Sequence, residues 1–379
     1  MNLKNSRHRL QVFCLVVAFA VTSLAIAVVS LAFGKVTADE PTTRDATLRT
    51  ALLRAEQVTD DRLASLATEG FSAVVLKLAA SADAARDDEA RAARRIVASG
   101  LALHYWIEIA HSPEFADAHP EWMASLQGHE EWRRFFPDVA KPAEGEVVKN
   151  YPWVPIFYRE AFDAHRDRVA RLLADKPPAA VIFLNDLQAA PSACGCGHPL
   201  CRWTTDYGPK LTATKLGPDA AARFVLEVKR LAPDSRIVPV WAIECEEHDK
   251  DGVCGGVGCF QGICWKAFTQ QLMPVMEQTE QLGVLLPYKL FERDLPVYGG
   301  EAAWITHALR LFETMPPVRG GKVVPVSKLI AVLQGWDVSP NQIQAQIQHA
   351  TNAGAAGFVV AFDKIDQSWQ PRVISMKPQ

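Results

Sequence analysis

Three acidic residues each lie near the end of an apolar run that is typical of a β-strand. They are Glu108, Asp186 and Glu244. Parallel strands end at the same edge of a sheet, so we expect the three carboxylates to meet in one pocket. Carboxylates held together above an apolar floor repel one another's charge, which raises the pKa of at least one of them. A proton donor beside a base or nucleophile is the pair that glycoside hydrolysis requires.

The alternation of side chains along a strand predicts which residues face this pocket. Residues two positions apart share a face, so Trp106 and Glu108 are expected to point inward together. On the next strand the same rule is taken to place Leu184 and Asp186 inward, and on the one after it Glu244. The alternative is that each acid is a solvated carboxylate or the ion-pair partner of a nearby lysine or arginine.

Other residues near the expected strand ends could bind a sugar. Flat aromatic rings cover the apolar faces of pyranoses, and Trp336 lies beside Asp337 at one such end. The lysines could donate to sugar hydroxyls or pair with acids, and a desolvated lysine could instead form a Schiff base with a carbonyl substrate. The expected substrate-binding residues are Trp106, Asn185, Trp336, Asp337, Lys77 and Lys289.

A cysteine-rich stretch, "SACGCGHPLCRW", follows the fourth expected strand, and four more cysteines follow the fifth. Disulfides between these neighbouring loops would reduce the chain freedom lost on folding. Their seven cysteines are an odd number, so one thiol is free, bound to metal or paired between chains. No cofactor is expected under the disulfide interpretation; the alternative is a structural zinc site or a redox centre. Its candidate ligands are Cys194, Cys196, Cys201, His198 and Cys259.

Apolar runs bounded by turn residues alternate with amphipathic stretches along the chain, which predicts strands alternating with helices in a parallel sheet. Eight such units close most economically into a single-domain (β/α)8 TIM barrel, with an open doubly wound sheet as the alternative. The long cysteine-rich loops then leave the carboxyl ends of strands four and five, where barrels build their sites. The expected strands are Leu48–Glu56, Phe71–Leu78, Leu101–Ala110, Ala179–Gln188, Arg236–Glu244, Val284–Leu290, Leu329–Trp336 and Gly357–Asp363.

Capping residues delimit several of the helices between these strands. One helix is expected to begin after a Thr59 cap and to end at Gly70. Another has Pro218 in its first turn and ends before Pro233. The last expected helix, which includes Ile343, ends at Gly354.

The N-terminus is typical of an export signal. Basic residues, among them Arg7 and Arg9, precede an apolar run over residues 10–33, and small residues follow it. We therefore expect residues 1–38 to be a signal peptide or an N-terminal membrane anchor, and residues 39–379 to be the barrel. The barrel would act in the periplasm, outside the cell or anchored to the outer face of the cytoplasmic membrane.

Composition limits the class of partner. With 49% hydrophobic and 22% charged residues the chain is globular, and its formal net charge of -3 gives no indication of a nucleic-acid partner. A carbohydrate or another small molecule is the expected ligand. Contact with a membrane is expected only through the N-terminal segment.

Four stretches carry a resemblance to a known group of proteins. They are "LATEGFSAVVLKL", "HPEWMASLQG", "FLND" and "QIQHATNAGAAGFVVAFD". Together they resemble the (β/α)8 glycoside-hydrolase-like proteins of bacteria, some of which carry a cysteine cluster in the loop after strand four. The resemblance spans roughly residues 47–365 and implies a barrel that acts on, or binds, a glycan.

The large clan of retaining glycosidases, with which such barrels are compared, ends strand four in Asn-Glu and strand seven in a nucleophilic glutamate. This chain has Asn185 and Asp186 at the first position, and Gln334 and Asp337 at the second. The resemblance thus implies that Asp186 takes the place of the proton donor. The departure at strand seven leaves the other strand-end acids, Glu244 or Glu108, as the expected base or nucleophile. An inverting mechanism, or a barrel that binds glycans without catalysis, is the alternative.

Overall fold

The computed structural model describes residues 48–79, 85–124, 126, 133, 136–187, 219–242, 274–287, 302–314, 324–366 and 368–375. These residues belong to one compact unit, which begins at residue 47. Within these ranges no helix combines the length and the apolar character needed to cross a bilayer. The expected export signal or anchor over residues 1–38 lies outside the described residues.

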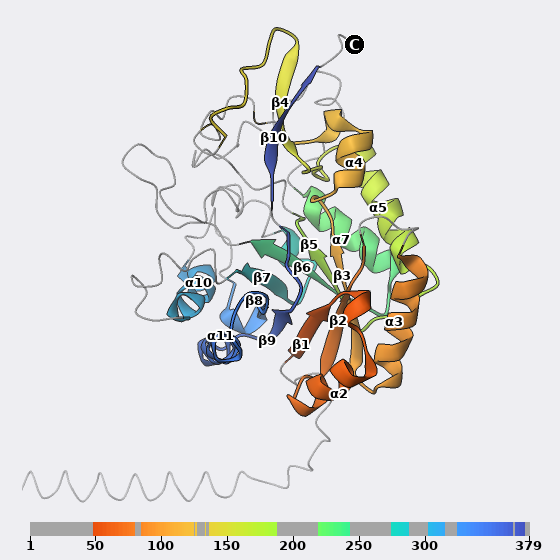
Figure 1. The fold of residues 1–379 in the computed structure, drawn as a ribbon, viewed down its shortest axis with the longest axis vertical. Coiled ribbons are helices and arrows are strands. Elements are labelled where there is room, and N and C mark those ends of the chain that lie inside the picture. The colour runs from red at the N-terminus through yellow and green to blue at the C-terminus, as the bar shows by residue number, and fades with distance from the viewer. Residues whose placement is uncertain are drawn as a thin grey trace, which may run out of the picture. The chain divides into compact units, whose positions relative to one another are not determined.

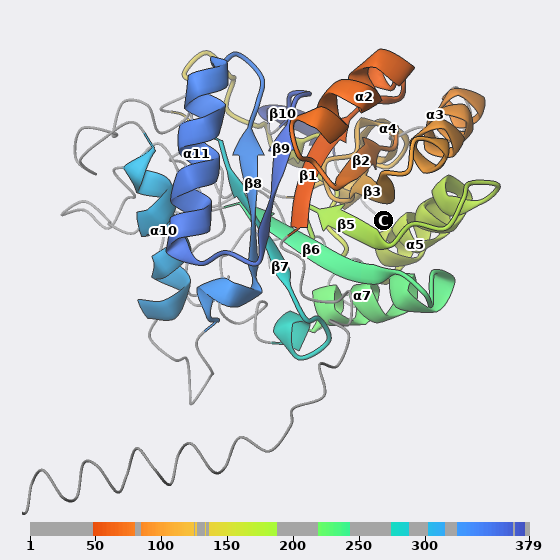
Figure 2. The ribbon, with the colours of Figure 1, turned by 90° about the horizontal axis from the view of Figure 1, so that it is seen from below.

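Eight parallel strands close into a barrel, which confirms the (β/α)8 prediction (Figures 1 and 2). All eight expected strands are present, and the barrel closes where β1 pairs with β9. The open doubly wound sheet is therefore wrong. In barrel order the strands are β1 Leu48–Leu53, β2 Ala73–Lys77, β3 Ala102–Glu108, β5 Val181–Asn185, β6 Arg236–Ala242, β7 Leu282–Leu286, β8 Leu329–Gln334 and β9 Gly357–Ala361.

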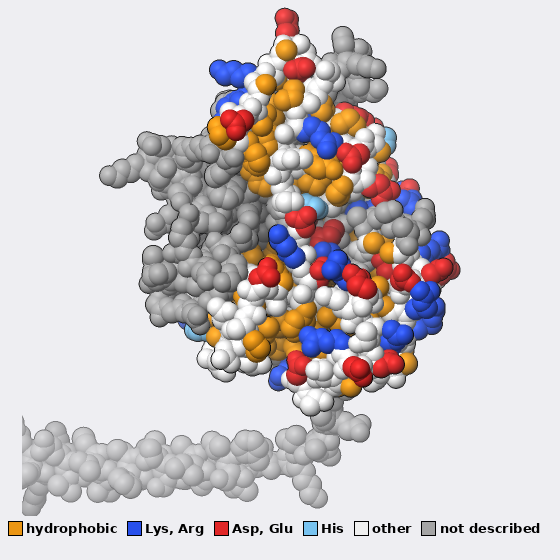
Figure 3. Space-filling model, viewed as in Figure 1, with side chains coloured by type: hydrophobic (Ala, Val, Ile, Leu, Met, Phe, Trp, Pro, Cys, Tyr) orange, Lys and Arg blue, Asp and Glu red, His pale blue; other side chains and the backbone are white. Residues whose placement is uncertain are grey.

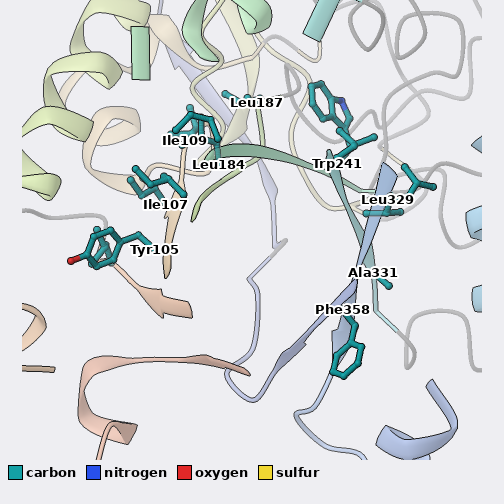
Figure 4. Close-up of a cluster of buried hydrophobic side chains, with 14 of the residues drawn as sticks. Tyr105, Ile107, Ile109, Leu184, Leu187, Trp241, Leu329, Ala331 and Phe358 are labelled. Carbon is teal, nitrogen blue, oxygen red and sulfur yellow. The ribbon is translucent and has the colours of Figure 1, made fainter. Parts of the chain in front are cut away.

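Two sets of buried side chains lie on the two faces of the barrel wall. Trp106, Phe183 and Val240 belong to the inner set, together with residues from the other strands. Tyr105 and Leu184 belong to the outer set, which packs toward the helices (Figure 4). This alternation with period two is what a parallel strand buried on both faces requires.

Helices surround the barrel, and their caps follow the sequence signals. The Thr59 hydroxyl accepts from the Arg62 backbone N–H at 3.2 Å. Gly70 and Gly354 adopt φ angles of +82° and +88°, the left-handed conformation that ends a helix at low cost in glycine. The helices are α2 Asp60–Thr68, α3 Arg86–Ala98, α4 Pro113–Ala118, α5 Arg159–Leu173, α7 Ala220–Leu231, α10 Ala303–Thr314 and α11 Pro340–Ala353.

Two further strands, which the sequence did not predict, form an antiparallel arm at one end of the barrel (Figure 1). β4 (Glu146–Tyr151) lies within the long connection after β3, and it pairs with β10 (Gln370–Ser375) near the C-terminus. Hydrophobic side chains gather over this arm on the face shown in Figure 3. On β4 the fully buried Lys149 donates to the carbonyls of Glu121 and Met123 at 3.2 and 3.0 Å, which holds the preceding loop against the arm.

Candidate active site at the barrel rim

Glu108 is the centre of a hydrogen-bonded group at the carboxyl end of β3. Its Oε1 accepts from the Trp106 indole N–H at 2.9 Å and lies 3.6 Å from the Lys77 ammonium. Its Oε2 accepts from the Asn185 Nδ2 at 2.6 Å. Trp106 and Glu108 thus share the inner face of β3, as the sequence predicted, and Lys77 reaches them from the end of β2. The side chain of Glu108 is about one-tenth exposed, so a small part of it is accessible to solvent.

These contacts keep Glu108 ionised. Burial alone would raise the pKa of this carboxyl, but the Lys77 charge, the hydrogen bonds from Asn185 and Trp106, and nearby His111 together lower it below its usual value. The expectation that crowding makes one acid a proton donor therefore does not apply to Glu108. A buried carboxylate that stays charged is suited to act as a base or a nucleophile.

Asp186 joins the same group in a way that the strand pattern did not predict. Phe183 faces the interior and Leu184 faces the helices, so the inward residue at the end of β5 is Asn185. The expected inward series through Leu184 and Asp186 is wrong by one residue. Asp186 has a φ angle of +60°, which breaks the strand alternation, and its Oδ2 accepts from the Asn185 Nδ2 at 3.0 Å. A single amide nitrogen thus binds both Glu108 and Asp186.

The group continues toward β1 through residues that the sequence analysis did not select. The Lys77 ammonium lies 3.6 Å from Asp363 Oδ2 and donates to the Lys364 carbonyl at 3.4 Å. Arg54 Nε lies 3.0 Å from Asp363 Oδ1. Lys77 was expected to bind substrate or to pair with an acid, and the structure shows the pairing. The sequence contained a signal that could have selected Asp363. It is the last residue of the final expected strand and lies two positions after Ala361, which faces inward, so strand alternation places it on the inner face.

On the other side of the barrel, β8 ends without a carboxylate. The Gln334 side chain donates to the Trp336 carbonyl at 2.9 Å, and its backbone exchanges two hydrogen bonds with the Gln346 amide of α11. Trp336 is partly exposed and packs against the inner set of side chains. Asp337 is exposed and, among the described residues, makes no hydrogen bond to Glu108 or Asp186.

Trp106 was expected to bind a sugar with an exposed face of its ring, but the structure buries this ring. It is fully buried and stacks on Phe183, with ring centroids 6.0 Å apart. Its ring therefore has no exposed face for a pyranose. Its contribution to the site is the indole N–H that binds Glu108.

Several expected site residues lie outside the described ranges. They include Glu244, two positions beyond the end of β6, and Lys289. The disulfide and zinc interpretations fall there too, and both stay predictions. Among the residues that the structure describes, no group of three or more His, Cys, Asp or Glu side chains is arranged to hold a metal ion. The candidate zinc ligands that lie outside the described residues are Cys194, Cys196, Cys201, His198 and Cys259.

A groove of about 230 Å³ lies between α5 and α7 on the outside of the barrel. It is lined by arginines and acids, some of which pair within their own helix, as Arg166 does with Asp163 at 2.8 Å. This groove is separate from the rim group, because its lining residues come only from the two helices.

Fold and rim together define a (β/α)8 barrel with a hydrogen-bonded acidic group at the carboxyl ends of its strands, the end at which such barrels carry their active sites.

A scan against protein-family models and a search of the curated proteins found no match to the sequence. Similar solved structures include a chitinase from Pseudoalteromonas aurantia, at 11% identity over 83% of this chain and 93% of that one, with a TM-score of 0.43. A class V chitinase from Pseudomonas fluorescens is 11% identical over 83% and 94% of the two chains, with a TM-score of 0.46. An endo-β-1,4-mannanase from Thermotoga petrophila is 10% identical over 84% and 68%, with a TM-score of 0.45.

Proposed function

We propose that the barrel hydrolyses a glycosidic bond at the rim, with Glu108 as the ionised carboxylate and Asp186 as the proton donor. One observation carries this proposal: the Asn185 Nδ2 binds both carboxyl groups, at 2.6 and 3.0 Å, beside a lysine that keeps Glu108 charged. Two acids with different environments at one site are what this reaction needs. Trp336, which is partly exposed, would supply an apolar surface for the sugar.

The spacing of the two acids favours retention of the anomeric configuration. Because both oxygens accept from one nitrogen atom, they lie closer together than the roughly 6.5 to 9.5 Å that separates the carboxyl groups of inverting enzymes. In this mechanism Asp186 protonates the leaving oxygen while Glu108 attacks the anomeric carbon. Water then releases the sugar from Glu108, and Asp186 takes up the proton of that water.

Asp186→Asn tests the assignment of the proton donor. The amide cannot protonate a leaving group, so we expect kcat on glycosides with poor leaving groups to fall by about a hundredfold or more. Activated aryl glycosides, which leave without protonation, should lose much less in their first step. Initial rates on matched pairs of substrates measure the difference. Equal losses on both kinds of substrate, or no loss, would contradict the assignment.

A second candidate function is glycan binding without catalysis. It is favoured by the end of β8, where Gln334 stands in place of the strand-seven carboxylate and is held by Trp336 and Gln346. Calorimetry distinguishes the two functions. A sugar that binds the wild-type protein and Asp186→Asn equally, with no turnover by either, would favour the binding function.

We also propose that the barrel acts outside the cytoplasm. The basic residues and the apolar run within residues 1–38 support this location. Disulfides in the cysteine-rich loops would persist in such a compartment.

A further inference from the structure

Arg168 lies on α5, on the outer side of the barrel wall, and its guanidinium is fully buried. Its Nη2 donates to the backbone carbonyls of Glu108 at 2.5 Å and of Ile109 at 3.1 Å. Its Nη1 lies 3.4 Å from the Ser112 hydroxyl. The guanidinium therefore binds the chain at the point where β3 ends and the Glu108 side chain turns into the site.

The backbone that follows Glu108 also holds Asp186 in place through hydrogen bonds. The Ile109 N–H donates to the Asn185 carbonyl at 3.0 Å, and the Ala110 N–H donates to the Asp186 carbonyl at 3.3 Å. The second bond supports the left-handed conformation of Asp186, which aspartate tolerates better than most residues but less well than glycine. A shift of residues 108–110 would thus move both carboxyl groups.

Burying the charge of Arg168 costs desolvation free energy, which a residue with only a packing role would not require. Among the described residues it forms no close ion pair with a carboxylate. Its desolvated charge is compensated by carbonyls, a hydroxyl, the Phe115 ring at 5.3 Å and the more distant negative charges of Glu114 and Glu108. Burial lowers its pKa to about 10, which leaves it charged at neutral pH. His165 supports it: the His165 Nδ1 lies 3.3 Å from the guanidinium, and its Nε2 lies 2.9 Å from the Val154 carbonyl.

We infer that Arg168 is a positioning residue for the rim site, which sets the backbone of Glu108 and, through Ala110, that of Asp186. This inference rests on the proposed function for its effect on turnover, but its effect on Glu108 itself does not depend on a substrate. The planar guanidinium of Arg168 binds two successive backbone carbonyls, and the single ammonium of a lysine is a poor substitute for it.

The test compares Arg168→Lys and Arg168→Met with Arg171→Met, which removes an exposed arginine from the same helix. Arg168→Lys keeps a buried charge and is the variant to use if Arg168→Met does not fold. Circular dichroism and urea unfolding establish that each variant is folded before the site is examined.

The first measurement is the ionisation of Glu108. It is monitored by recording tryptophan fluorescence as a function of pH. The Trp106 indole donates to Glu108, so the difference in emission between a protein and the same protein carrying Trp106→Phe reports that carboxyl group. In Arg168→Lys, displacement of Glu108 weakens its bonds from Asn185 and Trp106, and the acid midpoint should rise by about half a unit or more. Arg171→Met should leave the midpoint unchanged.

The second measurement is turnover. We expect kcat of Arg168→Lys to fall by about tenfold or more with KM within twofold, because misplaced acids slow the chemical step more than binding. A lower stability with the wild-type fluorescence midpoint would show that Arg168 is only structural and would overturn the inference. A shifted midpoint in a protein that hydrolyses no glycoside would uphold the positioning role and reject the proposed function.

Discussion

Glu108→Gln is expected to lower kcat/KM on every hydrolysed glycoside by at least about a thousandfold. The amide matches glutamate in shape but has neither the charge nor the nucleophilic oxygen that the reaction needs. Its NH2 group would also face the donors that now bind the carboxylate, Lys77 among them. Steady-state rates over a range of substrate concentrations measure the loss, and calorimetry shows whether the sugar still binds.

Glu56→Gln is the matched control for this variant. Glu56 follows β1 at the same rim, and its side chain is 63% exposed and paired with Arg54. We expect its rates to stay within twofold of the wild-type protein. A Glu108→Gln protein that is folded and as active as this control would contradict the central role of Glu108.

Lys77→Met is expected to destabilise the folded protein by about 3 kcal/mol near neutral pH, because it leaves the buried Glu108 carboxylate without its countercharge. In the wild-type protein the pKa of Glu108 is lowered on folding, so this carboxylate contributes stability above pH 4.5 that is lost as the pH falls through the lowered pKa. Without Lys77 the largest of the influences that lower this pKa is lost, so we expect burial to shift the pKa of Glu108 upward in the variant. The loss of stability should therefore be largest near pH 7 and become smaller as the pH falls below the pKa of Glu108 in the variant, because the buried carboxyl of the variant is then protonated and uncharged.

Urea unfolding at pH 7 and at pH 4.5 measures this dependence. Lys364→Met provides the control, since Lys364 is exposed and only its backbone carbonyl contacts Lys77. A loss for Lys77→Met that is equal at both pH values would show that lost packing, not the unpaired Glu108 charge, is the cause.

The barrel could be predicted from the sequence because its signals are local. Each strand is a short apolar run between turn residues, and helix ends such as Thr59 and Gly354 carry their own caps. The arm could not be predicted in this way. β4 and β10 are short strands with polar or charged residues at buried and partly buried positions. They pair across most of the chain, and neither has a pattern that indicates its partner.

The sequence predicted that strand-end residues lie together, and the structure shows this for Glu108, Asn185, Asp186 and Lys77, in an arrangement that differs from the predicted one. The alternation along β3 predicted correctly that Trp106 and Glu108 share its inner face, because a regular strand keeps period two. The alternation on β5 was assigned one residue out of phase, because both faces of that strand are buried and apolar. The left-handed turn at Asp186 then brought its carboxyl back to the site. Aspartate tolerates this conformation better than most residues, but the sequence does not show which aspartate adopts it. Arg168 could not be selected, since its contact is with backbone atoms.

The most direct test of the rim site is to trap its covalent intermediate. A 2-deoxy-2-fluoro glycoside of a sugar that the protein hydrolyses slows the release step, and mass spectrometry of the digested protein then locates the attached sugar. We expect one equivalent of sugar, on the peptide that contains Glu108, and none on Glu108→Gln. A hydrolysing wild-type protein labelled on a different residue, or left unlabelled because it releases the inverted anomer, would contradict the account.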